Sequence, residues 1–143
     1  MIGWASAPFD PEWERRYPRR AALMAFAGPA ANFTLMLIAA VLLRFGRADG
    51  WFHRGIDGQP SLLGITIFAF FSLNLLLGVF NLLPVPPLDG SAGILIFMGN
   101  DTAQRYLNWL RTTPYRSLGL LAAILGFRYL YGPIQAFVTN LLL

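Results

Sequence analysis

One acidic residue of this sequence, Asp89, stands where a carboxylate could do chemistry. It is the only one of the seven acids that apolar sequence flanks on both sides, between the proline-rich stretch Pro84–Pro87 and the apolar stretch Gly90–Met98. A carboxylate in such a place can cap a helix, pair with a cation or bind a metal ion. On position alone we favour capping of a short helix over Gly90–Met98, and the other two roles stay open.

A set of polar and small residues precedes this carboxylate. Asn74, Gly78 and Asn81 are spaced i, i+4, i+7, which places them on one face of a helix. Polar side chains at membrane depth usually face the interior of a helix bundle or a wet cavity. For Asn74 we favour hydrogen bonding between helices. Asn81 is set apart by the residues that follow it.

Long apolar stretches must hold these residues in place. Of the 143 residues, 56% are hydrophobic and 13% are charged, whereas a soluble domain carries about 25% charge. Ala21–Leu43 and Ser61–Leu83 contain no charged residue, and about 20 apolar residues are enough to cross a bilayer as a helix. Prolines then prevent the second helix from continuing. We therefore predict an all-α polytopic membrane bundle, because a small soluble helical domain would have too little polar surface.

We predict a single membrane domain over residues 1–143. Its parts are an N-terminal loop (1–20), a first span (21–44), a second span (61–83), a proline-rich break with a short helix (84–98) and a third span (117–143). The third span is either one kinked helix or a helix that ends near Tyr131 and is followed by an interfacial helix. The sequence leaves both open.

The basic residues indicate the partner and the orientation. All eleven are Arg, the net charge is +4, and they lie beside the apolar stretches. The expected anionic partner is therefore the lipid bilayer and not a nucleic acid. More arginines flank the start of the first span and the end of the second than the loop between them. The positive-inside rule then places the N-terminus and Asp89 toward the cytoplasm. The chain has no Cys, which excludes disulfides and thiolate ligands.

The order of residues around Asp89 resembles a known motif. Asn81–Gly90 reads NLLPVPPLDG, which is similar to the N-x-x-P-x-P-x-L-D-G motif of the site-2 protease family of intramembrane zinc metalloproteases (peptidase family M50). Gly28–Asn32, GPAAN, resembles the G-P-x-x-N motif on the preceding core helix of that family. Gly3–Pro11 resembles a loop that follows the first catalytic helix in one bacterial branch. The motifs stand in family order and cover most of the chain.

The resemblance implies a function for two of these residues. Asp89 would be the third protein ligand of a zinc ion, which would activate water for hydrolysis of a peptide bond. Asn81 would position the substrate or polarise its carbonyl group. The substrate would be a transmembrane or membrane-embedded protein or peptide, in a bacterial inner or cell membrane.

The resemblance also implies residues that pack beside the site. Gly28 and Asn32 lie four residues apart on one helical face, where they would pack closely and donate a hydrogen bond. Plain helix packing through small residues is an equally good interpretation of both. The implied packing residues are Gly28, Asn32, Pro84, Pro86 and Gly90.

The sequence departs from the family in one large respect. Family enzymes carry H-E-x-x-H on the first core helix, which supplies two His ligands and a Glu base. Here the one histidine, His53, is interpreted as a solvated loop residue, and the two glutamates, Glu12 and Glu14, lie in the N-terminal segment. One carboxylate cannot hold a catalytic zinc, which takes three protein ligands. We expect zinc only if the missing helix is supplied, and no activity from this chain alone.

Three explanations for the missing helix stay open. The start could be misassigned or the chain could be a fragment, which we favour because the family-like sequence continues up to Met1. The chain could instead be a degenerate homologue that serves as a scaffold or regulatory pseudoprotease, or a separate polypeptide could supply the helix. A transporter fragment is a weaker alternative, since transporters also use broken helices with Asn and Asp at mid-membrane.

Overall fold

The computed structural model describes residues 11–48, 61–112 and 116–143, and their regular secondary structure is entirely helical. The predicted all-α fold with three membrane-spanning helices is confirmed, because α2, α3 and α6 are long and apolar enough to cross a membrane. The Gly3–Asp10 part of the N-terminal motif and His53 lie outside the described residues. The helices are α1 (Pro11–Arg16), α2 (Pro18–Ala48), α3 (Leu62–Asn81), α4 (Asp89–Gly93), the 3₁₀ helix η1 (Ile94–Phe97), α5 (Asn100–Thr112) and α6 (Arg116–Leu142).

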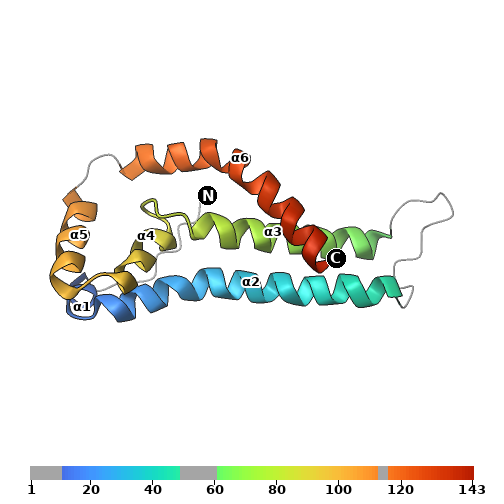
Figure 1. Cartoon of the computed structure of the whole chain (residues 1–143), viewed down its shortest axis with the longest axis horizontal. Helices are drawn as coiled ribbons and strands as arrows, with labels where there is room; N and C mark the ends of the chain where they lie inside the picture. The colour runs from blue at the N-terminus through green and yellow to red at the C-terminus, as the bar shows by residue number, and fades with distance from the viewer. Residues whose placement is uncertain (1–10, 49–60, 113–115) are drawn as a thin grey trace, which may run out of the picture.

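The antiparallel pair of α2 and α3 forms the centre of the molecule (Figure 1). Their seam is closely packed because α2 contributes small residues, Ala39 and Ala40, opposite Phe71 and Leu75 of α3. Helices in lipid associate mainly through such close packing, since the surrounding tails are as apolar as the side chains. Large apolar side chains on the outer faces, such as Leu62, are correspondingly exposed and suit contact with lipid.

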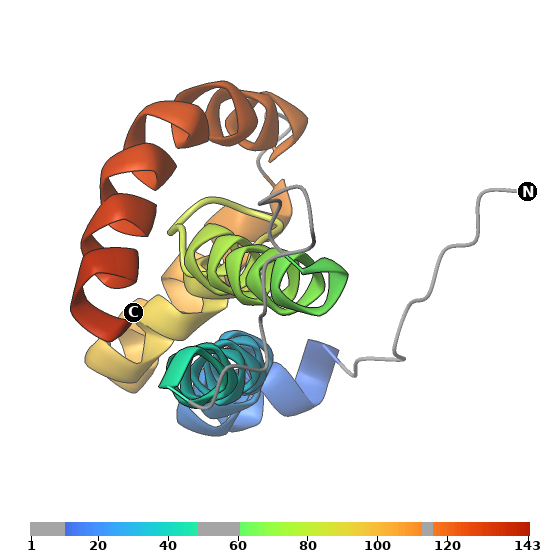
Figure 2. The same cartoon turned by 90° about the vertical axis from the view of Figure 1, so that its right-hand side faces the viewer.

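The third long helix, α6, packs on α3 and bends as it crosses (Figures 1 and 2). The Tyr131 hydroxyl donates a hydrogen bond of 2.8 Å to the backbone carbonyl of Ser72, and the ring of Phe127 meets that of Phe80 edge-on at 5.0 Å. The helix continues through Pro133, where proline removes a backbone hydrogen bond and favours a bend. Of the two alternatives for residues 117–143, the structure therefore has the single continuous helix.

The N-terminal segment is more helical than predicted. Residues 1–20 were expected to be a loop, but α1 begins at Pro11 and α2 begins at Pro18. Both prolines occupy the first helical position, where the missing N–H costs nothing and the fixed φ favours a helix. The acids Glu12 and Glu14 lie in the first turn of α1 and complement its dipole.

A further helix, α5, occupies the polar stretch after Gly99, to which the sequence analysis assigned no element. Ala103 and Leu107 are buried against Ala22 of α2 and Leu95 of η1, while most of the other α5 side chains are exposed. The four-residue spacing of these two apolar residues in a polar segment is the signal of an amphipathic helix. The helix therefore lies across the end of the bundle, next to α1 (Figure 1).

The connection between α3 and α4 is a tight turn without room for an extra side chain. The second span was predicted to reach residue 83, but α3 ends at Asn81, because the residues before Pro84 are driven out of helical geometry. The Val85 N–H then bonds the carbonyl of Leu83 at 2.8 Å, and the Leu88 N–H bonds that of Val85 at 2.9 Å. The turn brings the Leu82 and Leu83 carbonyls against the Cα of Gly90.

We expect Gly90→Ala to destabilise the protein by about 1–3 kcal/mol, the usual cost of overpacking. A Cβ at Gly90 would overlap the backbone of Leu82 and Leu83, which cannot move aside as a side chain would. Thermal unfolding in detergent, followed by the helical circular dichroism signal, measures the effect. The control is Gly126→Ala in α6, where a Cβ meets no atom of the described residues within 4 Å; its stability should be unchanged or slightly higher. Equal stability of Gly90→Ala and the wild type would contradict this packing.

Candidate functional site

The carboxylate of Asp89 faces α2. Its Oδ2 atom lies 3.0 Å from the point where a Cβ of Gly28 would be, so the glycine leaves the space that the carboxylate occupies. Asp89 is the first residue of α4, and the N-cap is Leu88, whose side chain makes no capping bond. The predicted capping role of Asp89 is therefore wrong. The helix begins one residue earlier than that role requires, and the carboxylate points to the neighbouring helix.

No other described side chain neutralises this carboxylate. Asp89 forms no hydrogen bond or ion pair within the described parts of the chain. Burial raises the pKa of its carboxyl group above the ordinary value, because desolvation disfavours the charged form. A partly desolvated carboxylate without a partner is a group that a cation or a hydrogen-bond donor would stabilise.

Two glycine contacts fix the register of α4 on α2. Asp89 and Gly93 lie four residues apart and therefore on the same face of α4. A Cβ at Gly93 would collide with the ring of Phe26, just as a Cβ at Gly28 would press on the Asp89 carboxylate. The structure thus brings Gly28 and Asp89 together from segments far apart in the sequence. Phe26 belongs to no motif, and its packing role follows only from its contact with Gly93.

The asparagines behave differently from one another. Asn74 is buried, and its amide donates a 2.9 Å hydrogen bond to the carbonyl of Phe70 in its own helix. Contrary to the prediction, the described residues therefore show Asn74 bonded within α3 and not to another helix. Asn32 and Asn81 are half-buried, and within the described residues their side chains form no hydrogen bond. The hydrogen bond expected of Asn32 beside the site and the role of Asn81 both stay predictions.

The face predicted from Asn74, Gly78 and Asn81 lies against α2. Gly78 is buried, and ring atoms of Phe33 come within 3.0 Å of the place where its Cβ would be. This contact lets α3 approach α2 just before the turn that leads to Asp89. Of the other predicted packing residues, Gly90 is buried, Pro86 is half-buried and Pro84 is exposed.

α5 holds α4 from the other side. The Tyr106 hydroxyl donates a 3.0 Å hydrogen bond to the backbone carbonyl of Ser91, and burial raises the pKa of this phenol. The Ser91 hydroxyl donates in turn to the carbonyl of Leu88 at 2.7 Å. No sequence motif singles out Tyr106, and only the amphipathic pattern of α5 indicates which of its residues face inward.

The residues present do not complete a zinc site. Among the described residues, no group of three or more His, Asp or Glu lies close enough together to hold a metal ion. A catalytic zinc takes three protein ligands and keeps a position for water, and Asp89 offers one ligand. No catalytic step follows from these residues alone.

The chain is similar to a curated protein of Bacillus subtilis (strain 168) that bears the name "Putative zinc metalloprotease YwhC". The two are 35% identical over 95 residues, which is 62% of this chain and 40% of that protein. The chain thus spans about two fifths of the length of this relative. No family model matches the chain, and no solved structure matches it.

We expect Asp89→Asn to change how stability depends on pH. A raised pKa in the folded state means that the folded protein binds its proton more tightly than the unfolded chain. Wild-type stability should therefore fall as the pH rises from the ordinary Asp pKa, about 4, through the raised value. The neutral amide does not become charged as the pH rises, so it pays no desolvation penalty. The variant should therefore be more stable than the wild type at neutral pH, and this difference should vanish in acid.

Thermal unfolding across this pH range, in the presence of a chelator, measures the difference. The matched control is Asp101→Asn, since Asp101 is exposed on α5, and it should follow the wild-type profile. A profile of Asp89→Asn parallel to that of the wild type would show that the carboxylate is not desolvated.

Proposed function

We propose that this chain carries the aspartate half of the zinc site in an intramembrane metalloprotease of the site-2 protease type. One observation carries the proposal: the Asp89 carboxylate, without a partner in the described residues, lies against Gly28. These two residues belong to the two segments that resemble motifs of that family. The likeness to a protein named as a zinc metalloprotease supports the same chemistry.

The open face of α2 supports a composite site. Gly28 is exposed although it touches Asp89, and the small residues Ala27 and Ala31 beside it are exposed as well. Small residues let another helix approach closely in lipid. A helix on this face that bears two histidines would complete the three protein ligands of a zinc ion around Asp89. We propose that a segment outside this chain supplies them.

The proposed substrate is a membrane-embedded protein segment. The turn between α3 and α4 presents irregular backbone beside Asp89. Its prolines have no N–H, and its other N–H groups are bonded within the chain, so only carbonyl oxygens of the turn are left for a substrate. Irregular backbone at membrane depth persists where it is buried or lines a wet cavity. We propose that an extended substrate docks here by donating its own N–H groups to carbonyls of the turn, with Asn81 beside the substrate carbonyl group.

We expect zinc only when the second half of the site is present. The purified chain should bind no stoichiometric zinc, since one carboxylate is too few ligands. A chimera in which this chain replaces the aligned region of YwhC should bind stoichiometric zinc and cleave a membrane-embedded peptide. Asp89→Asn in the chimera should lose both properties, and metal analysis with a cleavage assay measures them.

Asp101→Asn is the matched control and should keep both the zinc and the cleavage. Tight stoichiometric zinc on the chain alone would show that the ligand count is wrong. A chimera that folds but neither binds zinc nor cleaves the peptide would reject the protease and favour a scaffold or regulatory pseudoprotease.

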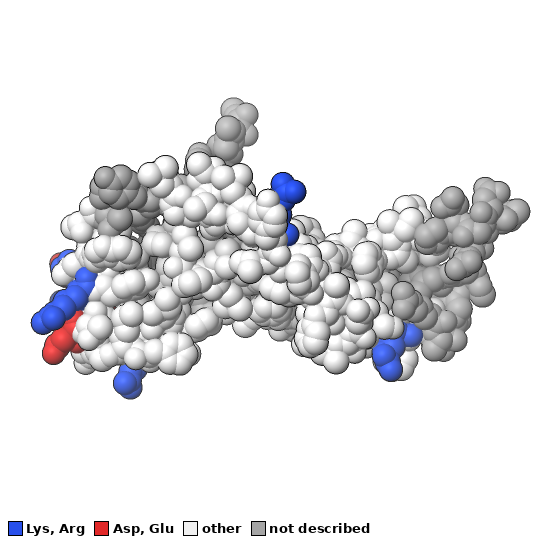
Figure 3. Space-filling view, turned by 45° about the horizontal axis from the view of Figure 1, so that its top comes forward, with Lys and Arg blue, Asp and Glu red and all other residues white. Residues whose placement is uncertain are grey.

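The same proposal places the Asp89 end of the bundle in the cytoplasm of a bacterial cell, with the chain in the inner membrane. α1, α4 and α5 lie at one end of α2 (Figure 1), and on the face in Figure 3 charged side chains gather over this end. The described arginines there are Arg15, Arg16, Arg19, Arg20 and Arg105. An excess of arginine marks the cytoplasmic side of a membrane protein.

Single cysteines test this orientation, and the absence of native Cys makes the labelling clean. In intact spheroplasts, an impermeant maleimide should label Arg44→Cys, at the far end of α2. It should label Gln104→Cys, on the exposed side of α5, only after the membrane is permeabilised. Labelling in the reverse order would invert the proposed orientation.

A further inference from the structure

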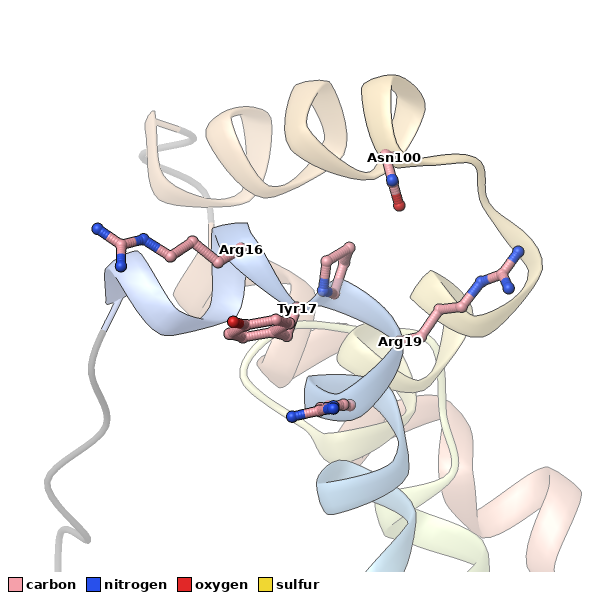
Figure 4. A pocket seen from close by; sticks show the side chains of 6 residues that line it. Arg16, Tyr17, Arg19 and Asn100 are labelled. Atoms are coloured by element: carbon pink, nitrogen blue, oxygen red, sulfur yellow. The ribbon is translucent and has the colours of Figure 1, made fainter.

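A hollow of about 430 Å³ opens where α1, the start of α2 and the start of α5 meet. Three arginines line it, together with Tyr17, Pro18 and Asn100. The side chain of Asn100 points toward the hollow from α5, and Arg16 and Arg19 extend to opposite sides of it (Figure 4). The hollow lies at the basic end of the bundle and is separate from Asp89, which does not line it.

The arginines of the hollow are weakly engaged within the described residues. Arg19 forms no ion pair or hydrogen bond there. Arg16 approaches Glu12 at 3.8 Å, but both side chains are about three quarters exposed, and an exposed pair of this kind contributes little. The guanidinium of Arg20 lies 4.9 Å from the ring centroid of Tyr17, a contact that leaves its N–H donors available to an anion.

The walls of the hollow are held together by contacts between helices. The Arg15 side chain, on α1, donates a 2.7 Å hydrogen bond to the side-chain carbonyl of Asn108 on α5. The rings of Trp13 and Tyr17 pack at 5.9 Å. The site therefore rests on two helices that are tied to each other, and not on one helix terminus.

The hollow also lies at the start of the first candidate membrane helix. This helix runs over Pro18–Gly46 and Pro18 lines the hollow, so a bilayer crossed by the helix would have its headgroups near the hollow. Trp and Tyr are enriched at the boundary between lipid and water, as Trp13, Tyr17 and Trp109 are here. The anionic group with the highest concentration at this depth is the phosphate of a phospholipid.

We infer that this hollow binds the phosphate of an anionic phospholipid headgroup. The forked guanidinium donors of Arg19 and Arg20 match phosphate oxygens, and the Asn100 amide supplies a further donor. Among the described residues, three arginines and no acid line the hollow. The bound lipid would hold α1 and α5 at the membrane surface, whether or not the protease proposal is correct.

Lipid retention by the purified chain tests this inference. In native mass spectrometry from detergent, the wild type should retain phosphatidylglycerol and lose phosphatidylcholine with the same acyl chains. The double variant Arg19→Gln and Arg20→Gln should weaken phosphatidylglycerol retention about tenfold or more, because each arginine near an anionic surface contributes about fivefold. Arg44→Gln, an exposed arginine at the other end of α2, should match the wild type.

A second variant and a competitor complete the test. Asn100→Asp adds a negative charge to the wall of the hollow without changing α2, and it should also weaken retention of phosphatidylglycerol. An excess of inorganic phosphate should leave the lipid bound. Equal retention of both lipids, or unchanged retention by the double variant with wild-type helical content, would overturn the inference. Displacement by inorganic phosphate would also overturn it and make the free anion the ligand.

Discussion

The position of Asp89 depends on glycines that leave space for groups of other segments. Gly78 admits the ring of Phe33, Gly93 admits the ring of Phe26, and Gly28 admits the carboxylate itself. Gly90 does the same for the backbone of the preceding turn. A Cβ at Gly90 or Gly93 would overlap its neighbour, and one at Gly28 or Gly78 would force its neighbour to shift by a few tenths of an ångström. Because lipid gives helices little reason to associate other than close packing, these contacts hold α3 and α4 on α2.

This packing gives the carboxylate an unusual environment. A partly buried charge normally finds a partner, since its desolvation is otherwise uncompensated. Asp89 has none within the described residues, and the helix face beside it is exposed and lined by small residues. The unpaired carboxylate lowers the stability of the protein, and it lies beside an open face of α2. A further segment that packs on this face is suited to supply its missing partner. The proposed protease uses this arrangement, in which neither half binds the metal alone.

The arginines at the same end of the bundle have different surroundings. There α1 and α5 lie across the bundle and present arginines and aromatic side chains where the first span begins. Charges that would be costly inside the bilayer are favourable at its surface, where anionic headgroups supply the counter-charge. The end of the bundle thus combines a carboxylate on the inside with a basic rim on the outside. In the lipid-binding proposal the rim anchors the short helices, and α5 contacts α4 through the hydrogen bond from Tyr106 to Ser91.

The sequence by itself determined the all-helical fold, the three spans and the break after α3, because apolar length and proline geometry act locally along the chain. It also singled out Asp89, because a lone acid between apolar stretches is conspicuous without any structure. The tertiary structure decided what Asp89 contacts: it is not a cap but a neighbour of Gly28, and that contact joins segments whose distance no local pattern encodes. The hydrogen bond of Asn74 within its own helix, the burial of Ala103 and Leu107, and the hollow among the arginines were likewise decided by packing between helices. These features are stabilised by contacts between residues far apart in the sequence. The residue types alone were compatible with more than one partner, so the sequence could not select among them.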